Sequence, residues 1–396
     1  MRRVGVSCSQ TRARAGMALH QVHRPSRDDW NRFVTAQPGA TIYQSYEWGD
    51  IRRSHGWEPH YIALAHEGEW VAAALVLAKQ LPAGLGTMLY SPRGPIMTAW
   101  MDAAPALLEA VALLARQCGA MFWRIEPPVA HDDLSVADCV VQAGFVPVEQ
   151  EWSYWNRPKY EMKLNIASGE AAVFAGLGTK IRTKVRHASK RGVLIEEGYT
   201  EQDMENFYRL LKNTGEKKRI PVRGLDYFHS LYRTFIKSGM ARLVLARKDG
   251  TPVAGGMTVR YGTTATLLYL SNDYSMQRAG WAVQWEMLRW AMAQGCTTYD
   301  FGGTGTGYPP QETDKGYGVY QFKHSFGAQI VRWYGCADYV FRPLSYRAFR
   351  LIERQLPYGE RLFIEWPKQL LHRWRSHATQ ARPSSASAPE HKASED

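Results

Sequence analysis

The stretch HYIALAHEGEWVAAALVLA, residues His60–Ala78, decides the fold because it reads as two β-strands joined by a turn at Glu67-Gly68. A second stretch, ARLVLARKDGTPVAGGMTV (Ala241–Val259), reads in the same way, with Asp249-Gly250 at its turn. The two stretches begin about 180 residues apart. We therefore expect two hairpins that descend from an internal duplication.

Each hairpin is followed by a further strand and then by an amphipathic helix that ends at a glycine. The spacing predicts these helices over Ala104–Gln117, before Gly119, and over Ala282–Gln294, before Gly295. A short strand that closes on an acid follows each helix; the two acids are Glu126 and Asp300. The pattern indicates an α+β fold with mixed sheets. It also contains the central parts of the acyltransferase fold typified by N-acetyltransferases.

Length and composition bound the remaining choices. The chain has 396 residues, 45% of them hydrophobic and 22% charged, which is ordinary globular composition and enough for two domains. The 49 Lys and Arg residues exceed the 37 Asp and Glu residues by 12, so a polyanionic partner such as RNA, a phosphorylated substrate or an anionic membrane face is expected. Five cysteines stand singly, which argues against a zinc site or a disulfide scaffold and favours the cytoplasm.

The ends of the chain look different from its middle. Residues 1–18 are predicted to be a disordered basic leader, with Met17 as an alternative start, and residues 379–396 a disordered polar tail. Between them we expect a first domain over 19–157, a second over 158–342, and C-terminal helices over 343–378 that pack back on the domains. No apolar stretch approaches the length of a membrane-spanning helix, and no metal or cofactor is expected.

A basic segment, KIRTKVRHASKRG, is expected to form one short helix. No acid interrupts it, so its cations repel one another unless an anion lies nearby. A solvated helix face and a contact with the phosphate backbone of RNA are both compatible with this pattern. The candidate RNA-binding side chains are Lys180, Arg182, Lys184, Arg186 and Lys190.

The segment QSYEWGDIRRSHGW reads as a helix start. Ser45 is placed to cap the helix, with Trp48 and Ile51 toward the core and Arg52 or Arg53 outward. From spacing alone a surface helix with a buried tryptophan is the favoured interpretation.

The segment KKRIPVRGLDYF reads as a stiffened loop before another helix. Arg223 lies there, four residues before Tyr227, and a guanidinium on a loop at a helix entrance suits bidentate phosphate binding. An ordinary surface arginine fits the same spacing.

The stretch TYDFGGTGTGYPPQETDKGYGVYQFKHSFG (Thr298–Gly327) contains glycines that let backbone approach a ligand closely, and then Phe322 beside Lys323. Neither of the glycine motifs that bind nucleotide phosphates, G-x-G-x-x-G and G-x-x-x-x-G-K-S/T, is present in register. Upstream, Gln277–Ala282 fits the loose Q/R-x-x-G-x-G/A pattern with which acetyl-CoA-dependent transferases present backbone amides to a pyrophosphate, although an ordinary turn into a helix fits it too.

Five of these segments, in order along Gln44–Tyr346, resemble the FemABX family, the aminoacyl-tRNA-dependent transferases that build the cross-bridge of peptidoglycan. They are QSYEW, KIRTKVRHASKRGV, FYRLLKNTGEKKRIPVRGLDYF, QWEMLRWAMAQGCTTYDFGG and GVYQFKHSFG. The resemblance implies a tandem pair of acetyltransferase-like (GNAT-like) domains with mixed, largely antiparallel sheets flanked by helices. It also implies transfer of glycine, alanine or serine from aminoacyl-tRNA to the stem-peptide amine of lipid II or UDP-MurNAc-pentapeptide.

The resemblance also implies roles for particular residues. Arg52 and Arg223 match the two cations that contact the precursor diphosphate, and Tyr227 and Tyr269 match residues near its sugar-peptide portion. Lys323, with Phe322 beside it, matches the lysine at the tRNA end of the site. Two departures stand out: an arginine at position 52 where some relatives have lysine, and no room for the long coiled-coil insertion that other members carry.

Two alternatives stay open at this point. The first is an acyl-CoA-dependent N-acyltransferase acting on another amine, which is suggested by the Gln277–Ala282 pattern. The second is a catalytically silent RNA-binding relative, for which the positive charge is the motive. A peripheral contact between the basic C-terminal helices and the cytosolic membrane face is a further expectation.

Overall fold

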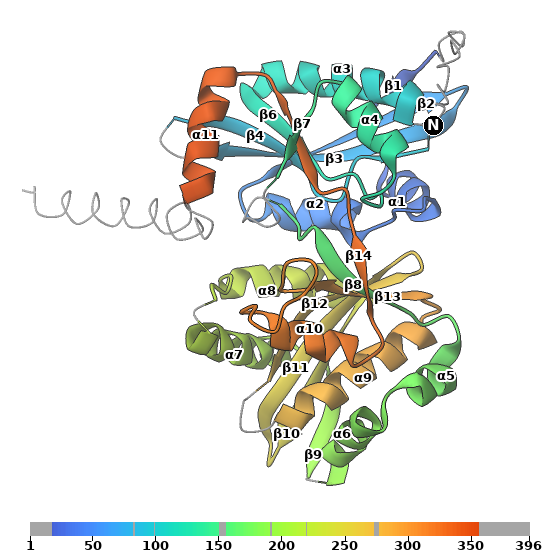
Figure 1. Cartoon of the computed structure of the whole chain (residues 1–396), viewed down its shortest axis with the longest axis vertical. Coiled ribbons are helices and arrows are strands. Elements are labelled where there is room, and N and C mark those ends of the chain that lie inside the picture. Colours follow the sequence, from blue (N-terminus) through green and yellow to red (C-terminus); the bar gives the residue numbers. More distant parts are fainter. Residues whose placement is uncertain are drawn as a thin grey trace, which may run out of the picture.

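The computed structural model of the chain describes residues 18–81, 84–98, 100–149, 156–190, 192–218, 220–272 and 277–355. Figure 1 shows two mixed sheets, one in each half of the molecule, with helices packed on both. In the upper half the strand order is β1-β2-β3-β4-β6-β15-β7, with the short β5 pairing β3. In the lower half the order is β9-β10-β11-β12-β13-β8-β14. The predicted α+β fold with tandem GNAT-like sheets is confirmed.

Both expected hairpins are present, and their turns have the same geometry. Strands β2 (Glu58–His66) and β3 (Glu69–Leu81) are joined through Glu67 and Gly68, with φ of 49° and 88°. Strands β10 (Ala241–Lys248) and β11 (Thr251–Tyr261) are joined through Asp249 and Gly250, with φ of 50° and 75°. Two central residues with positive φ are typical of the type I′ turn, which matches the twist of a two-residue hairpin.

The crossover that follows each hairpin is also duplicated. Helix α3 (Trp100–Cys118) connects β4 (Gly86–Ser91) to the parallel strand β6 (Ala120–Ile125). Helix α9 (Gln277–Ala293) connects β12 (Thr264–Asn272) to the parallel strand β13 (Thr298–Gly303). The remaining strands are β1 (His20–Val22), β5 (Ile96–Met97), β7 (Val146–Val148), β8 (Tyr160–Asn165), β9 (Val193–Gly198), β14 (Gln329–Arg332) and β15 (Cys336–Val340).

The period-two alternation of the strands divides the upper half into two cores. Leu75 and Leu77 of β3 face a cluster that includes helices α1 (Arg27–Ala36) and α2 (Tyr46–Arg53). Val76, between them, faces α3 and α4 (Leu134–Gln142) on the opposite side. The other helices are α5 (Gly169–Gly176), α6 (Thr179–Lys190), α7 (Glu201–Lys218), α8 (Leu225–Leu231), α10 (Tyr317–His324) and α11 (Pro343–Gln355), with short turns of helix at Ile42–Gln44 and Tyr232–Ile236.

The chain crosses between the two halves twice. Strand β8 enters the lower sheet beside β13, and after β14 the chain returns so that β15 lies between β6 and β7 of the upper sheet. Arg124 of β6 binds Asp338 of β15 and Glu353 of α11. The expected domain boundaries, after residues 157 and 342, remain a proposal. Strand β15 was expected within the second domain, but it is hydrogen-bonded into the sheet of the first.

Helix α11 packs on the upper sheet, with Phe349 against Phe122 of β6. The remainder of the predicted C-terminal helical region, residues 1–17 of the leader predicted over 1–18, and the predicted tail lie outside the described residues. Within the described ranges no helix combines the length and apolar character needed to cross a bilayer.

Candidate active site

Helix α2 carries the first expected cation. Ser45 caps it by accepting a hydrogen bond from the Trp48 N–H at 3.0 Å, and Trp48 and Ile51 are buried, as predicted. Of the two arginines considered for the outward face, Arg53 is exposed, whereas Arg52 is only 7% exposed. Its guanidinium carbon lies 4.7 Å from the centre of the Trp57 ring, so an aromatic face shields one side of a charge held at the domain boundary.

A lysine that the sequence did not single out lies over the same tryptophan. The Lys79 ammonium is 5.9 Å from the centre of the Trp57 ring and donates a hydrogen bond to the Gly56 carbonyl at 2.7 Å. Burial and then Arg52 lower the pKa of Lys79. Two neighbouring cations, one of which has a lowered pKa, create a place where an anion is favourable.

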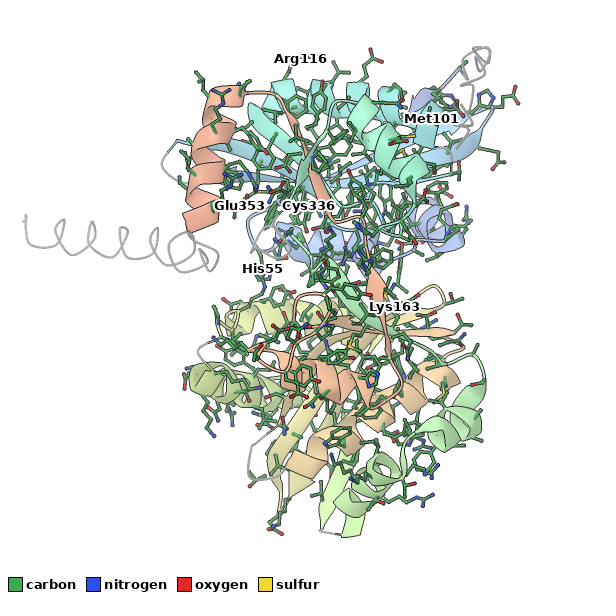
Figure 2. All side chains as sticks on the ribbon, in the orientation of Figure 1. His55, Met101, Arg116, Lys163, Cys336 and Glu353 are labelled. Carbon is green, nitrogen blue, oxygen red and sulfur yellow. The ribbon has the colours of Figure 1, made fainter. Side chains whose placement is uncertain are left out.

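His55 connects this cluster to the lower half. Its Nε2 lies 3.2 Å from Ser230 Oγ, and its ring centre is 5.1 Å from that of Tyr227. Burial, then Arg52 and then Arg223 lower the pKa of His55, while Asp226 opposes them. Figure 2 shows His55 at the boundary between the two halves. A guanidinium from each half of the molecule therefore acts on the His55 imidazole. The two expected diphosphate-binding cations, Arg52 and Arg223, both lie near His55.

The two tyrosines named from the sequence lie on the lower side of His55. The Arg223 guanidinium carbon is 5.0 Å from the centre of the Tyr227 ring. Burial and then Tyr227 raise the pKa of Tyr269 well above its ordinary value, so the two phenols lie close together. The structure thus brings Arg52, Arg223, Tyr227 and Tyr269 together, with His55 and Lys79 as additional members.

A buried ionic strip, which the sequence did not predict, continues along the boundary. The Arg157 guanidinium lies 4.0 Å from the centre of the Tyr43 ring and 3.8 Å from the Glu161 carboxylate. Arg93 binds the same carboxylate at 2.7 Å, with both side chains almost fully buried. Burial opposes ionisation of Glu161, but Arg93 and Arg157 hold its pKa below the ordinary value. The carboxylate is therefore ionised at neutral pH.

Glu126, noted in the sequence as the acid that closes a strand, orients this strip. Its carboxylate accepts hydrogen bonds from the Tyr90 hydroxyl at 2.9 Å, from the Arg93 N–H at 3.0 Å and from the Arg157 N–H at 2.5 Å. It binds the backbone of the two residues whose guanidinium groups reach Glu161. Glu126 thus positions Arg93 and Arg157, the two arginines that bind Glu161.

Lys323 lies farther along, on α10, and is only 8% exposed. Its ammonium donates to the Gly303 carbonyl at 2.5 Å. Burial lowers the pKa of Lys323 to about 8, against the opposing effects of Asp300 and Glu161. A lysine with this pKa is mostly charged at pH 7 and loses its charge within the physiological range.

The glycine-rich loop before α10 was expected to let the backbone approach a ligand, but in the structure its glycines approach one another. A Cβ at Gly316 would lie 1.9 Å from the Gly305 carbonyl oxygen, so the close approach occurs within the loop's own backbone. Gly305 itself has a positive φ of 79°. The glycines therefore let the loop fold tightly and direct α10, with Lys323, into the domain boundary.

Asp300, noted in the sequence as the acid that closes the second of the two short strands, is buried in β13. Its carboxylate accepts the Gly302 N–H at 2.7 Å and lies 3.8 Å from the Lys163 ammonium. Burial and then Glu161 raise its pKa. Figure 2 shows Lys163 at the same boundary as His55. The hydrogen bond from the Gly302 N–H supports a structural role for Asp300 in the backbone of this strand.

Phe322 and Lys323 are neighbours in sequence but contact different groups. The Phe322 ring centre is 4.6 Å from that of Trp281, and the Lys184 ammonium is 4.1 Å from the Trp281 ring. Phe322 therefore connects α10 to α9 and to the basic helix α6, whereas Lys323 points to the loop at Gly303. Trp281, in the middle of this chain of contacts, was not predicted as a site residue.

The basic helix α6 is only partly a solvated face. The Arg182 guanidinium donates to the Ala175 carbonyl at 2.8 Å, and that of Arg186 lies 5.1 Å from the centre of the Phe174 ring. These contacts use part of the cationic surface to hold α5 against α6. Lys180 is exposed, and the side chain of Lys190 lies outside the described residues.

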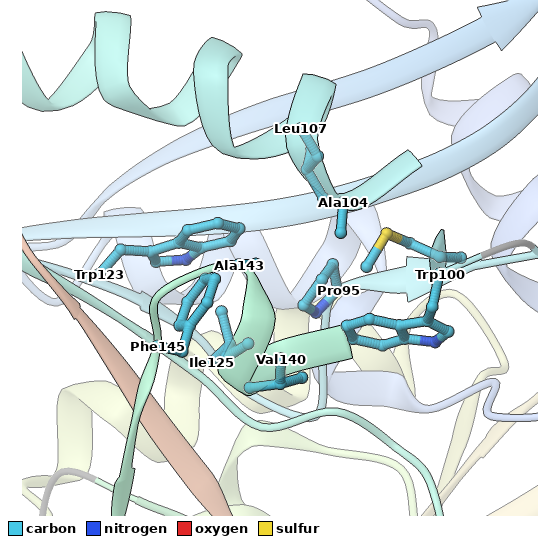
Figure 3. A pocket seen from close by; sticks show the side chains of 10 residues that line it. Pro95, Trp100, Ala104, Leu107, Trp123, Ile125, Val140, Ala143 and Phe145 are labelled. Atoms are coloured by element: carbon cyan, nitrogen blue, oxygen red, sulfur yellow. The ribbon is translucent and has the colours of Figure 1, made fainter. Parts of the chain in front are cut away.

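An apolar pocket lies on the other face of the upper sheet, between α3, α4 and β6 (Figure 3). Trp100, Trp123 and Phe145 are among its lining residues, none of which is charged. Nothing in this lining would neutralise a phosphate. The charged boundary between the halves is therefore the better candidate site.

Comparisons with known proteins agree with this architecture. The FemAB family model matches residues 26–142, and an acetyltransferase (GNAT) domain model matches residues 178–323. A lipid II:glycine glycyltransferase from Staphylococcus haemolyticus is 25% identical over 84% of this chain and 95% of its own length. The crystal structure of FemX superposes with a TM-score of 0.75 at 21% identity, over 83% of this chain and 99% of FemX. A tandem GNAT protein from the clavulanic acid pathway gives a TM-score of 0.51 at 10% identity, over 81% of this chain and 98% of its own.

Two GNAT-like sheets, joined by a charged and partly buried boundary, define an acyltransferase. The matches to both halves narrow this class further. Over most of its length the chain is similar to the FemABX family.

Proposed function

We propose that this acyltransferase moves an amino acid from aminoacyl-tRNA onto the stem-peptide amine of a peptidoglycan precursor during formation of the interpeptide bridge. The acceptor is lipid II or UDP-MurNAc-pentapeptide, and the transferred residue is glycine, alanine or serine. The glycyltransferase name of the relatives favours glycine and the lipid-linked acceptor. The enzyme would work in the cytoplasm, at the inner face of the plasma membrane.

The observation that carries the proposal is the cation cluster at the domain boundary. Arg52 and Arg223 come from different halves and both act on the His55 imidazole. A diphosphate is the small anion best matched to two guanidinium groups, since each can bind one phosphate through paired N–H donors. Both precursors contain a diphosphate, so binding it would also hold the two halves in a fixed relation.

The chemistry asks little of the protein beyond positioning. An aminoacyl ester is already activated, so no covalent nucleophile is needed, and bringing ester and amine together supplies on the order of 7–11 kcal/mol. The Lys323 ammonium would stabilise the oxyanion that forms as the amine attacks the ester carbonyl. A donor in such a position contributes about 3 kcal/mol. The proton lost by the amine would go to a substrate phosphate or to the ribose hydroxyl of the tRNA.

The donor would approach from the side of α6. Lys180, Arg182, Lys184, Arg186 and Lys190 would bind the tRNA backbone. The contact of Lys184 with Trp281, and of Trp281 with Phe322, gives a continuous path from that helix to the residue beside Lys323. Tyr227 and Tyr269 would contact the sugar-peptide portion of the acceptor.

The test is transfer of a radiolabelled amino acid from a panel of charged tRNAs to soluble and lipid-linked muropeptides. We expect product with at least one pair of substrates, and ribonuclease added beforehand should abolish it. Transfer that survives ribonuclease, or absence of transfer with every pair, would contradict the proposal.

The acyl-CoA alternative retains one supporting observation. Helix α9 begins at Gln277, so the Gln277–Ala282 motif lies at a helix N-terminus, where backbone N–H groups are available to an anion. Calorimetry with acetyl-CoA separates the two functions. We expect no stoichiometric binding, and tight binding with acetyl transfer to an amine would favour the alternative.

The affinity for a diphosphate diester is expected to rise as the pH falls, because His55 becomes protonated beside it. Burial, Arg52 and Arg223 lower the pKa of His55 in the free protein, whereas a bound anion raises it. The affinity therefore rises as the pH falls through the pKa of His55 in the complex and levels off below its pKa in the free protein. A charge-assisted contact predicts about a tenfold gain between about pH 7.5 and pH 5.5. Titration with UDP-MurNAc-pentapeptide by calorimetry measures it.

Two variants make this pH dependence attributable to one residue. His55→Gln should bind with a nearly constant affinity over the same range, whereas His20→Gln, an exposed histidine on β1, should behave as the wild type. An unchanged pH dependence in His55→Gln would show that another group titrates.

A further inference from the structure

The last described helix, α11, has two faces of different chemistry. Its inner face is packed: Phe349 is 1% exposed and its ring centre lies 4.9 Å from that of Phe122, in the core of the upper half. Glu353, the one acid in the helix, is 3% exposed and binds Arg124 and Arg350. The inner face therefore attaches α11 to the upper half. The only acidic residue of the helix, Glu353, is paired on that face.

The outer face combines leucines with arginines. Leu344 is 81% exposed, more than any other large apolar side chain among the described residues, and Leu351 is 62% exposed. Arg347 and Arg354 are exposed on the same face, at the i, i+3, i+7 and i+10 positions counted from Leu344. Arg342, just before the helix, adds another exposed cation.

We propose that this face of α11 docks on an anionic lipid bilayer, with the helix lying in the plane of the membrane surface. Exposed leucines alternating with arginines are typical of interfacial helices, whose apolar side chains enter the headgroup boundary while the cations bind anionic lipids. RNA would match the arginines but would leave both leucines in water. The combination therefore favours a bilayer over a nucleic acid.

The position of α11 relative to the candidate site fits a lipid-linked acceptor, and this part of the inference rests on the proposed function. Phe349 of α11, Tyr90 and Trp57 belong to one continuous core on one face of the upper sheet. Trp57 lies directly beneath Arg52. Figure 1 shows α11 against β4 and β6, with α2 in the same half. The docking face and Arg52 thus belong to one side of the upper sheet, so an acceptor whose diphosphate lies at the membrane surface could reach Arg52 without leaving the bilayer.

Vesicle flotation of the full chain tests the docking face without any substrate. The vesicles are phosphatidylcholine alone and phosphatidylcholine with phosphatidylglycerol, at low and at high ionic strength. We expect the wild type to float with the anionic vesicles at low salt. Leu344→Ser with Leu351→Ser, and separately Arg347→Gln with Arg354→Gln, should each weaken the partition coefficient by about tenfold or more.

A matched control uses an exposed leucine and an exposed arginine of the lower half. Leu194→Ser with Arg233→Gln changes one side chain of each kind on β9 and near α8, and it should float as the wild type does. Because all the altered side chains are exposed, thermal melting should be unchanged in every variant. A variant that melts early is replaced by the single substitutions Leu344→Ser or Arg347→Gln.

Three results would overturn the docking face: no flotation of the wild type, equal flotation of both α11 variants and the wild type, or unchanged flotation together with a loss of tRNA binding in the arginine variant. Transfer to the soluble UDP-linked acceptor separates this inference from the proposed function. If docking is right, the α11 variants keep that activity. If the proposed function alone fails, flotation persists while no transfer is found.

Discussion

Replacing Lys323 by alanine is expected to lower kcat about 10²- to 10³-fold, which is the cost of removing one donor to a developing oxyanion. The ammonium is buried on α10 and already directed into the domain boundary by its hydrogen bond to Gly303. It would therefore meet the tetrahedral intermediate without first being ordered or stripped of water. KM for the acceptor should change little, because the acceptor's diphosphate is bound elsewhere, near Arg52 and Arg223.

The pH profile gives this prediction a second readout. The pKa of Lys323 is lowered to about 8, so its positive charge is present below pH 8 and is lost as the pH rises through that value. A catalytic role for the charge predicts that kcat of the wild type falls above about pH 8. Lys323→Arg keeps a charge at high pH, so its smaller residual kcat should lack this alkaline decline.

The control for Lys323 is Lys248→Ala, which removes an exposed lysine from the end of β10, away from the boundary. Its kcat should equal that of the wild type. Thermal melting of each variant shows whether a loss of activity reflects a loss of structure. A fully active and folded Lys323→Ala enzyme would place the reactive centre elsewhere.

Much of the fold could be predicted because its signals are local. The turns at Glu67-Gly68 and Asp249-Gly250 specify their hairpins through two consecutive residues with positive φ. The helices that follow end just before Gly119 and Gly295, both of which have a positive φ. In each case residues close in sequence determine the structure, and their repetition revealed the duplication.

The exchange of β15 could not be predicted in this way. Cys336–Val340 has the composition of any short strand, and nothing in it distinguishes an edge of the second sheet from a place between β6 and β7. What selects that place is Arg124, 214 residues from Asp338, with which it forms a buried ion pair. A contact of that separation leaves no periodic trace in one sequence.

The residues of the candidate site that match family motifs could be predicted from the sequence. Those that only the folded structure brings to the site were missed. Arg52, Arg223 and Lys323 came from motifs. His55 and Lys79 did not, because a lone histidine and a lysine at a strand end carry no pattern until folding brings them to Arg52. Trp57, which lies under two cations, similarly reads as an ordinary core tryptophan.

Replacing Arg124 by methionine is expected to destabilise the folded protein by about 3–5 kcal/mol. Its guanidinium is fully buried and binds the Asp338 carboxylate at 2.7 and 2.8 Å and that of Glu353 at 2.6 and 3.1 Å. Methionine fills a similar volume but leaves two buried carboxylates without their shared cation. Urea unfolding monitored by tryptophan fluorescence measures the loss, with the midpoint and slope compared separately.

The exposed Arg289 provides a matched control, since it also binds two carboxylates, those of Glu170 and Glu286. Arg289→Met should cost no more than about 1 kcal/mol, because water solvates the carboxylates that it leaves. Similar small losses in both variants would mean that the buried pair contributes little.

A triple variant separates the penalty of unpaired charge from the attraction within the cluster. In Arg124→Met with Asp338→Asn and Glu353→Gln, none of the three fully buried ions remains, so much of the stability lost in Arg124→Met should return. If stability does return but β15 no longer holds its place, the ion pairs serve specificity more than stability. That outcome would appear as loss of transfer and of vesicle binding in a protein that still unfolds cooperatively, because β15 and α11 connect the lower half to the face that carries Arg52.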